Sequence, residues 1–135
     1  FCDRDFADKT EIISYLGTFL YSRGKITDAE EYVQAVLERE SLLSTEVGFL
    51  IAIPHGISAS VKESFAAVLK LKTPMKWDEE EVQYIINLGV PKEKRANDQI
   101  DALAALSSHL MLDDFRESIY KAQNEEELFD VLNSI

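Results

Sequence analysis

The sequence has few of the residues that form cross-links or thiolate metal sites. It contains one cysteine, Cys2, among 135 residues, so no disulfide can form within the chain. A metal site built from several thiolates is excluded for the same reason. We interpret Cys2 as an incidental thiol, and the scarcity of cysteine fits a cytoplasmic setting.

Basic residues and long apolar runs are also scarce. Lys and Arg number 14 against 25 Asp and Glu, which gives a net charge of -11. Nucleic acids and anionic membrane surfaces are bound through Lys and Arg, so we expect neither as a partner of this domain, whereas a basic protein partner is compatible with the charge. No apolar run reaches the ~18 residues that a membrane helix needs, so no membrane insertion is expected.

Several catalytic motifs are missing as well. There is no Gly-x-Ser-x-Gly segment for a nucleophilic serine, and the five glycines form no glycine-rich loop for a nucleotide. Neither a His-x-x-x-His nor a Cys-x-x-Cys segment occurs, which argues against metal binding. The chemistry that remains open is a lone imidazole acting as a nucleophile or a general base.

What the sequence does contain is a globular composition, 46% hydrophobic and 29% charged, over the length of one ordinary domain. Capping boxes at Asp8–Glu11 and Thr27–Glu30 begin two amphipathic helices. Strands are predicted over 49–53, 65–71 and 82–90, and further helices after Asn97, Asp113 and Asn124. The pair Thr73–Pro74 is expected to end the second strand. This pattern predicts an α/β fold, with one mixed sheet flanked by helices on both faces and residues 1–135 in a single domain.

Two histidines are candidates for the lone imidazole. His55 is expected in a loop after the apolar stretch Phe49–Ile53 and Pro54, where a buried strand breaks at the edge of the sheet. Sites form at such places in α/β folds. From this spacing alone, a functional imidazole and a structural one both remain open for His55. His109 lies on the amphipathic helix predicted after Asn97, so we interpret it as a core or boundary residue.

One chemistry open to His55 is phosphoryl transfer, because a neutral imidazole nitrogen can attack phosphorus and hold the group as a phosphoramidate. Such a step needs positive charge or N–H donors around the transferred group. Arg39 and the backbone amides near Gly56 are the candidates. Arg39 lies in the last turn of its predicted helix, where a solvated cation that suits the helix dipole is an equally good interpretation.

A resemblance to a known family rests on the string Ile51-Ala52-Ile53-Pro54-His55-Gly56, preceded by Leu37-Glu38-Arg39-Glu40 and by Ser44-Thr45. These segments are similar to the enzyme IIA domains of the fructose/mannitol type, which belong to the bacterial sugar phosphotransferase system. The turn at 24–27 and the C-terminal segment 113–128 share the likeness. It therefore covers nearly the whole chain.

The resemblance implies a single α/β domain whose histidine accepts a phosphoryl group. The implied donor is the histidine-containing phosphocarrier protein, and the implied acceptor is a cysteine or histidine of an enzyme IIB domain. His55 matches the phosphorylated histidine, Arg39 matches the arginine that flanks it, and Thr45 falls in the Ser-Thr motif close to the same site. The resemblance implies no metal or organic cofactor for this step.

The sequence departs from the family pattern at three places. Gln99 stands where many members carry a second histidine, and His109 is too far along the helix to replace it. Glu46 replaces a glycine, and its carboxylate is expected to oppose an incoming phosphoryl group if it points inward. Phe49 and Leu50 replace the last two residues of a Gly-Asn-Gly segment, which removes backbone freedom close to the site. These changes predict slower transfer by a retained acceptor.

A second, looser likeness involves Thr73-Pro74-Met75-Lys76-Trp77 and the following Val82-Gln83. These segments resemble the enzyme IIA-like domains of sugar-operon transcriptional regulators, in which phosphorylation reports sugar status. Three hypotheses therefore stay open: a phosphocarrier that serves a transporter, a regulatory module in which phosphorylated His55 acts on adjacent regulatory domains, and an α/β domain that has lost the activity. The first residue is Phe1 instead of Met, which is compatible with a domain cut from a longer protein.

Overall fold

A computed structural model describes residues 6–42, 44–63, 65–92, 105, 108, 109 and 112–123 of the chain. Gln99 and the helix expected after Asn124 lie outside these residues. The described elements are α1 (Lys9–Ser22), α2 (Ala29–Leu42), β1 (Glu46–Gly48), β2 (Ile51–Ala52), β3 (His55–Ser58), β4 (Phe65–Lys76), β5 (Glu81–Pro91) and α4 (Asp113–Lys121).

The first two helices begin where a carboxylate caps a free N–H group. Asp8 accepts a hydrogen bond from a first-turn amide at 2.9 Å, which confirms the predicted start of α1. In α2 the cap is Asp28, which accepts from a first-turn amide at 3.2 Å. The predicted cap at Thr27 is therefore wrong by one residue. The Thr27 amide instead donates to the Ser60 carbonyl at 2.8 Å, so Thr27 pairs with the segment that follows β3.

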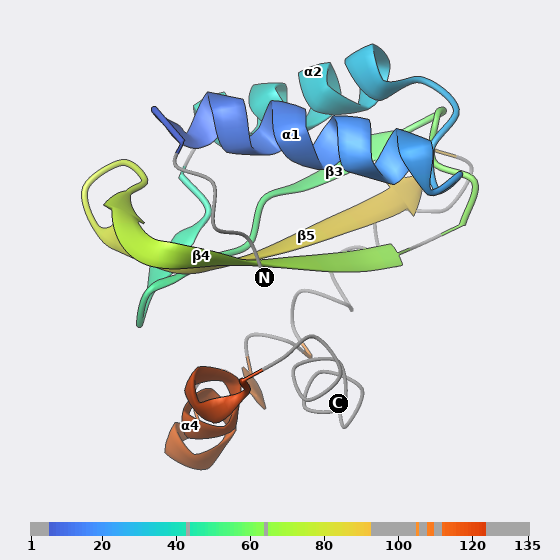
Figure 1. The fold of residues 1–135 in the computed structure, drawn as a ribbon. Helices are drawn as coiled ribbons and strands as arrows, with labels where there is room; N and C mark the ends of the chain where they lie inside the picture. Colours follow the sequence, from blue (N-terminus) through green and yellow to red (C-terminus); the bar gives the residue numbers. More distant parts are fainter. Residues whose placement is uncertain are drawn as a thin grey trace.

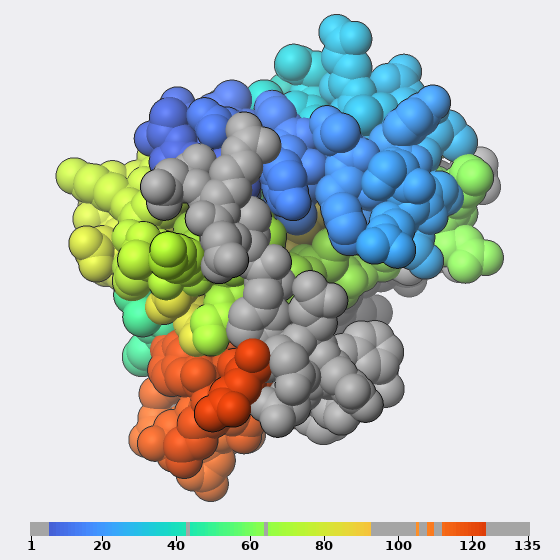
Figure 2. Space-filling model, viewed as in Figure 1, coloured from blue at the N-terminus to red at the C-terminus, as the bar shows by residue number. Residues whose placement is uncertain are grey.

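The described strands form one mixed sheet with β5 at its centre. β2 and β3 follow one another along one edge of β5 and run parallel to it, whereas β4 runs antiparallel along the other edge and β1 pairs with β2. α1 and α2 cover one face of the sheet, and α4 lies on the opposite side (Figure 1). In the space-filling view the two N-terminal helices form the upper surface and α4 the lower end (Figure 2). The predicted fold class is thereby confirmed.

The register of β2 and β3 against β5 is continuous across Pro54. Ile51 lies opposite Tyr84 and His55 lies opposite Leu88, so the pairing advances by four residues on both sides. Pro54 has no N–H and cannot donate to the ladder, which interrupts the strand without shifting it. His55 is therefore the first residue of β3, and the prediction that it lies in a loop is wrong because the strand resumes after the proline.

The strand predicted over 49–53 is also wrong at its start. Phe49 and Leu50 have φ angles of 58° and 66° and form the turn between β1 and β2. Residues other than glycine, asparagine and aspartate rarely adopt this left-handed conformation. An apolar run that contains such a turn therefore has the same sequence pattern as a buried strand.

β4 continues beyond the predicted end of its strand. The prediction stops before Thr73–Pro74, whereas β4 extends to Lys76 with a register shift between Lys70 and Met75. Among the described strands β4 pairs only with β5, so one edge of β4 is open. A proline is tolerated on such an edge or in a bulge, because its missing N–H interrupts no central ladder.

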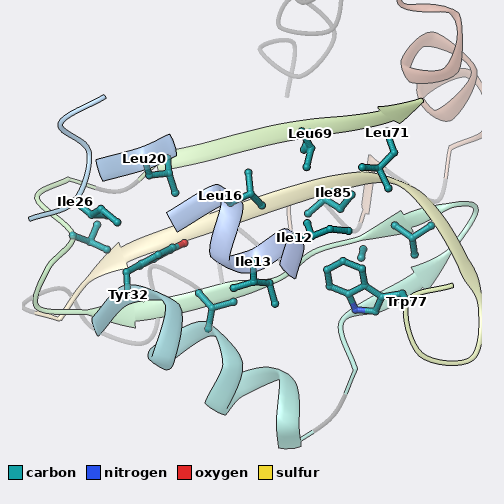
Figure 3. Close-up of a cluster of buried hydrophobic side chains, with 14 residues drawn as sticks. Ile12, Ile13, Leu16, Leu20, Ile26, Tyr32, Leu69, Leu71, Trp77 and Ile85 are labelled. Atoms are coloured by element: carbon teal, nitrogen blue, oxygen red, sulfur yellow. The ribbon is translucent and has the colours of Figure 1, made fainter. Parts of the chain in front are cut away.

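The sheet separates two apolar clusters. The cluster between the sheet and the first two helices is shown in Figure 3, and the cluster under α4 contains Ile53 and Ile119. Neighbouring residues of β5 alternate between them, with Ile85 in the first cluster and Tyr84 and Ile86 in the second. This alternation places apolar side chains of β5 on both faces of the sheet, and it leaves the residues before His55 packed from both sides.

The crossing of α1 and α2 gives a test of the packing. A Cβ built on Gly17 would lie 2.4 Å from Cγ2 of Val33. Helix propensity alone predicts that Gly17→Ala stabilises the protein by about 1 kcal/mol, whereas overpacking costs about 1–3 kcal/mol. We predict a net loss of stability in urea denaturation.

The matched control for this prediction is the Val33→Ala background, where the space is open. There Gly17→Ala is expected to raise the free energy of unfolding, because only the propensity effect remains. A gain in stability for Gly17→Ala in the otherwise wild-type chain would contradict the close contact between the helices.

Candidate functional site

The His55 imidazole is buried where β2 gives way to β3, with 6% of the residue exposed. Its Nδ1 lies 2.9 Å from the carbonyl oxygen of Ile53. A carbonyl oxygen can only accept a hydrogen bond, so Nδ1 carries the proton and donates it. The neutral ring therefore keeps the lone pair on Nε2, and Nε2 is the nitrogen able to act as a nucleophile.

The surroundings of His55 favour this neutral form. Burial lowers the pKa of the imidazole, because the charged ring loses its hydration. In decreasing order of size, the bond to the Ile53 carbonyl raises this pKa, the Arg39 guanidinium lowers it and the Glu40 carboxylate raises it. The net pKa lies below the ordinary value of 6.5, so the ring is neutral at physiological pH.

Helix α2 brings Arg39 to the same site. Arg39 is half-buried in the last turn of α2, close enough for its charge to act on His55. One turn earlier, Val36 packs over Gly56, where an added Cβ would lie 3.0 Å from Cγ2 of Val36. The absence of a side chain at Gly56 therefore lets the helix approach the strand. A cation in this place suits the end of the helix dipole and also an anionic group bonded to the ring.

Glu40 is a buried acid in this site, with only 4% of the residue exposed. Its carboxylate accepts hydrogen bonds from the Thr45 amide at 2.9 Å and the Thr45 hydroxyl at 2.7 Å. It also accepts from Nε1 of Trp77 at 2.8 Å, and Nζ of Lys9 lies 3.6 Å away. A buried carboxylate is costly unless it is paired and hydrogen-bonded, and Glu40 is both. The side chain thus ties α2 to the segment before β1 and to the β4–β5 turn.

Thr45 connects this carboxylate to the strand that precedes His55. Its amide and its hydroxyl each donate a hydrogen bond to the Glu40 carboxylate. Its carbonyl accepts a hydrogen bond from the Ile53 amide at 3.0 Å. Because the Ile53 carbonyl holds the imidazole, Thr45 is linked to the ring through one intervening residue, and its hydroxyl points to the acid instead of lying free.

The Glu46 carboxylate is held by the turn between β4 and β5. It accepts hydrogen bonds from the amides of Asp78, Glu79 and Glu80 at 3.3, 3.2 and 3.2 Å. Successive amides that converge in this way bind an anion. Glu46 was expected to oppose a phosphoryl group on His55 if it pointed inward, and this condition is not met because the turn holds the carboxylate.

The strained turn before β2 is held by α4. The Arg116 guanidinium carbon lies 3.8 Å from the centroid of the Phe49 ring, and the Tyr120 hydroxyl donates to the Phe49 carbonyl. Left-handed backbone at residues other than glycine costs about 1–3 kcal/mol each. The contacts with α4 offset part of this cost at Phe49 and Leu50, where a glycine would need no such support.

His109 is held by contacts with its own segment and with α4. His109 donates from Nδ1 to the Ala105 carbonyl at 2.8 Å and packs edge-on against Phe115, with ring centroids 5.4 Å apart. This packing agrees with a boundary residue. Gln99 lies outside the described residues. Within the part of the chain that the structure describes, no group of three His, Cys, Asp or Glu side chains could hold a metal ion, and no helix is long and apolar enough to cross a membrane.

Comparison with known proteins gives one family and several relatives. The model of the family "Phosphoenolpyruvate-dependent sugar phosphotransferase system, EIIA 2" matches residues 1–135. The chain is 33% identical over 132 residues to the PTS system 2-O-alpha-mannosyl-D-glycerate-specific EIIABC component of Escherichia coli (strain K12), covering 95% of this chain and 20% of that protein. It is 35% identical over 134 residues to the probable licABCH operon regulator of Bacillus subtilis (strain 168), covering 98% of this chain and 20% of that protein.

A solved structure supports the same relationship. The crystal structure of IIA mannitol from Escherichia coli superposes with a TM-score of 0.78 and 27% sequence identity. The match covers 98% of this chain and 94% of that one. By contrast, the chain spans about a fifth of the length of the two curated relatives above.

The contacts of Glu40 give a stability prediction. Glu40→Ala removes the acceptor from the Trp77 indole and from the Thr45 amide, and each buried donor left unpaired costs about 1–3 kcal/mol. We predict a loss on the order of 3 kcal/mol in chemical denaturation. Glu40→Gln is expected to cost less, because it keeps the shape and one acceptor oxygen.

Glu38 offers the matched control, since it is an exposed acid on the same helix. Glu38→Ala is expected to change stability by no more than about 0.5 kcal/mol. Equal losses for Glu38→Ala and Glu40→Ala would contradict the structural role of the buried carboxylate.

Proposed function

The chain belongs to the EIIA 2 family of the phosphoenolpyruvate-dependent sugar phosphotransferase system, and we propose that it carries a phosphoryl group on Nε2 of His55. The observation that carries this proposal is the hydrogen bond from Nδ1 to the Ile53 carbonyl, which leaves Nε2 with its lone pair. The lowered pKa of His55 supports it, because the neutral ring is the nucleophilic form. The proposed donor is the histidine-containing phosphocarrier protein.

The proposed reaction is a substitution at phosphorus. The Nε2 lone pair of His55 forms a new N–P bond while the N–P bond to the donor histidine breaks, and the electron pair of the broken bond stays on the donor imidazole. The His55 ring becomes positive as the bond forms. The Ile53 carbonyl, which accepts from Nδ1–H, stabilises this charge, so no proton has to leave the ring during the attack.

The other site residues receive distinct proposed roles. Arg39 supplies the positive charge that stabilises the phosphoryl oxygens in the transition state. Thr45 acts indirectly, because its hydroxyl and amide are bonded to Glu40 while its carbonyl holds Ile53. Gln99 is proposed to hydrogen-bond a phosphoryl oxygen or the imidazole; as a neutral amide it cannot serve as an acid or base. The step is proposed to need no metal or organic cofactor.

We further propose that phosphorylated His55 passes its group to an enzyme IIB domain in the cytoplasm and so supports sugar uptake. The 33% identical relative supports this step, because its name is that of a sugar-specific EIIABC component. The acceptor would be a cysteine or histidine, since either can displace the group from the phosphoramidate.

A regulatory role is the second candidate. The chain is 35% identical to a probable operon regulator, and the segment 73–77 resembles that branch. Under this hypothesis, phosphorylation of His55 changes contacts with adjacent regulatory domains, and transfer of the phosphoryl group to an enzyme IIB domain is unimportant. Label that reaches His55 and then passes to no enzyme IIB domain would favour regulation, whereas rapid transfer would favour transport.

The acceptor is tested by labelling the protein from phosphoenolpyruvate with enzyme I and the phosphocarrier protein. Wild type is expected to gain acid-labile phosphate, and His55→Ala to gain none. Arg39→Ala is expected to fold normally and accept label on the order of a hundredfold more slowly, as when one transition-state donor is removed. His109→Ala is the control and should label like wild type. Phosphate label on the His55→Ala variant would contradict the proposal.

The pH dependence of the transfer tests the state of the ring. Because the pKa of His55 is lowered below 6.5, the lone pair is lost only at lower pH than in an ordinary histidine. We predict that the single-turnover rate falls as the pH is lowered, with the midpoint of the fall below pH 6.5. In Arg39→Ala the fall should begin at higher pH, because Arg39 lowers this pKa. A wild-type rate that declines well above pH 6.5 would contradict the neutral, buried ring.

A further inference from the structure

Asn87 is a polar residue in the middle of the central strand, with 0% of the residue exposed. A buried amide is costly unless its groups are hydrogen-bonded. Its Oδ1 accepts from the Tyr32 hydroxyl at 2.5 Å, and its Nδ2 donates to the Pro54 carbonyl at 3.2 Å. The Pro54 carbonyl can only accept, so this orientation of the amide is the one that satisfies both partners.

The Pro54 carbonyl belongs to the peptide that leads directly into His55. It accepts from the Leu88 amide at 3.0 Å as well as from Asn87. Two donors from β5 therefore fix the plane of the Pro54–His55 peptide. They do so at the point where proline removes a donor from the ladder and where the strand would otherwise be held least.

Tyr32 extends the same connection to α2. Its side chain reaches from the helix towards β5, with the hydroxyl at the strand (Figure 3). Burial raises the pKa of the Tyr32 hydroxyl, so it remains protonated and acts as a donor. Tyr32 and Arg39 are seven residues apart on α2, which is close to two turns, so they lie near one face of the helix with Val36 between them.

We propose that Tyr32 and Asn87 are positioning residues for phosphoryl transfer at His55. Their hydrogen bond joins the peptide before His55 to the helix that carries Arg39. It thereby sets the distance between the nucleophile and the cation that meets the transferred group. This inference rests on the proposed function of His55 and assigns it two residues that make no contact with the phosphoryl group.

The chemistry of the pair separates positioning from folding. Phenylalanine and leucine have nearly the shapes of tyrosine and asparagine without their polar atoms. When both partners of a buried hydrogen bond become apolar groups of the same shape, stability changes little. The Pro54 carbonyl keeps the Leu88 amide in such a variant, so it retains a partner. The Leu88 carbonyl loses only a long bond of 3.4 Å from the Tyr32 hydroxyl.

The experiment compares Tyr32→Phe, Asn87→Leu and the double variant with wild type, each in the complete chain. The double variant is expected to unfold at a temperature close to that of wild type. All three are expected to accept label from the phosphorylated phosphocarrier protein on the order of tenfold more slowly, since a misplacement of about 1 Å costs up to about a hundredfold. The double variant should be no slower than Asn87→Leu, because Asn87→Leu already removes both the bond to Tyr32 and the bond to the Pro54 carbonyl.

A cycle with Arg39→Ala supplies the readout that a purely structural role would not move. In wild type Arg39→Ala removes a well-placed cation, whereas in Tyr32→Phe the cation is already displaced. The rate loss caused by Arg39→Ala is therefore expected to be several-fold smaller in the Tyr32→Phe background. Ile85→Val, a core change on the same strand, serves as the control that lowers stability without changing the transfer rate or this cycle.

Normal transfer rates in all three variants would overturn the positioning role, and so would an Arg39→Ala effect of the same size in both backgrounds. Wild type that gains no label on His55 would overturn the proposed function itself. The two failures are therefore distinguishable in one set of assays.

Discussion

One hydrogen bond, from Nδ1 of His55 to the carbonyl of Ile53, is the contact on which the rest of the site depends. It fixes the tautomer, because a carbonyl only accepts, and it selects Nε2 as the nitrogen with a free lone pair. The surrounding structure holds both ends of this bond. Thr45 and Glu40 hold the Ile53 side, and the donors from β5 hold the Pro54 peptide on the other. Pro54 interrupts the strand, but β2 and β3 keep the same register against β5. The ring therefore lies at a defined position along the sheet.

The site is embedded in a buried polar network that an apolar core would not need. Among the described residues, the buried polar side chains include Glu40, Thr45, His55 and Asn87. Each would be costly if unpaired, and each has a partner. Apolar substitutes could give similar stability, but they could not specify the orientation of one carbonyl or one ring. We interpret the network as the means by which α2 and the sheet are kept in one relative position while the proposed phosphoryl group is transferred to the His55 ring.

The sequence predicts much of the fold, because the signals concerned are local. The cap of α1 at Asp8, the apolar run of β5 and the proline before His55 all act within a few residues. The roles of Glu40 and Asn87 could not be predicted in this way, since their partners Trp77 and Tyr32 are distant in sequence. The left-handed turn after β1 has the sequence pattern of a strand because its residues are apolar, and the support from α4 is not visible in the sequence. For Glu40 and Asn87, the sequence signal is a polar residue in a position that is otherwise expected to be apolar and buried.

The most direct test of this account is the protonation of the His55 ring, measured by nitrogen-15 NMR before and after phosphorylation. The account predicts a neutral ring at pH 7 with the proton on Nδ1, and coupling of phosphorus to Nε2 once the group is attached. The hydrogen bond to the Ile53 carbonyl should persist in both states. A ring protonated on Nε2 in the free protein, or phosphorus attached to Nδ1, would contradict it, because the bond to Ile53 would then not determine which nitrogen reacts.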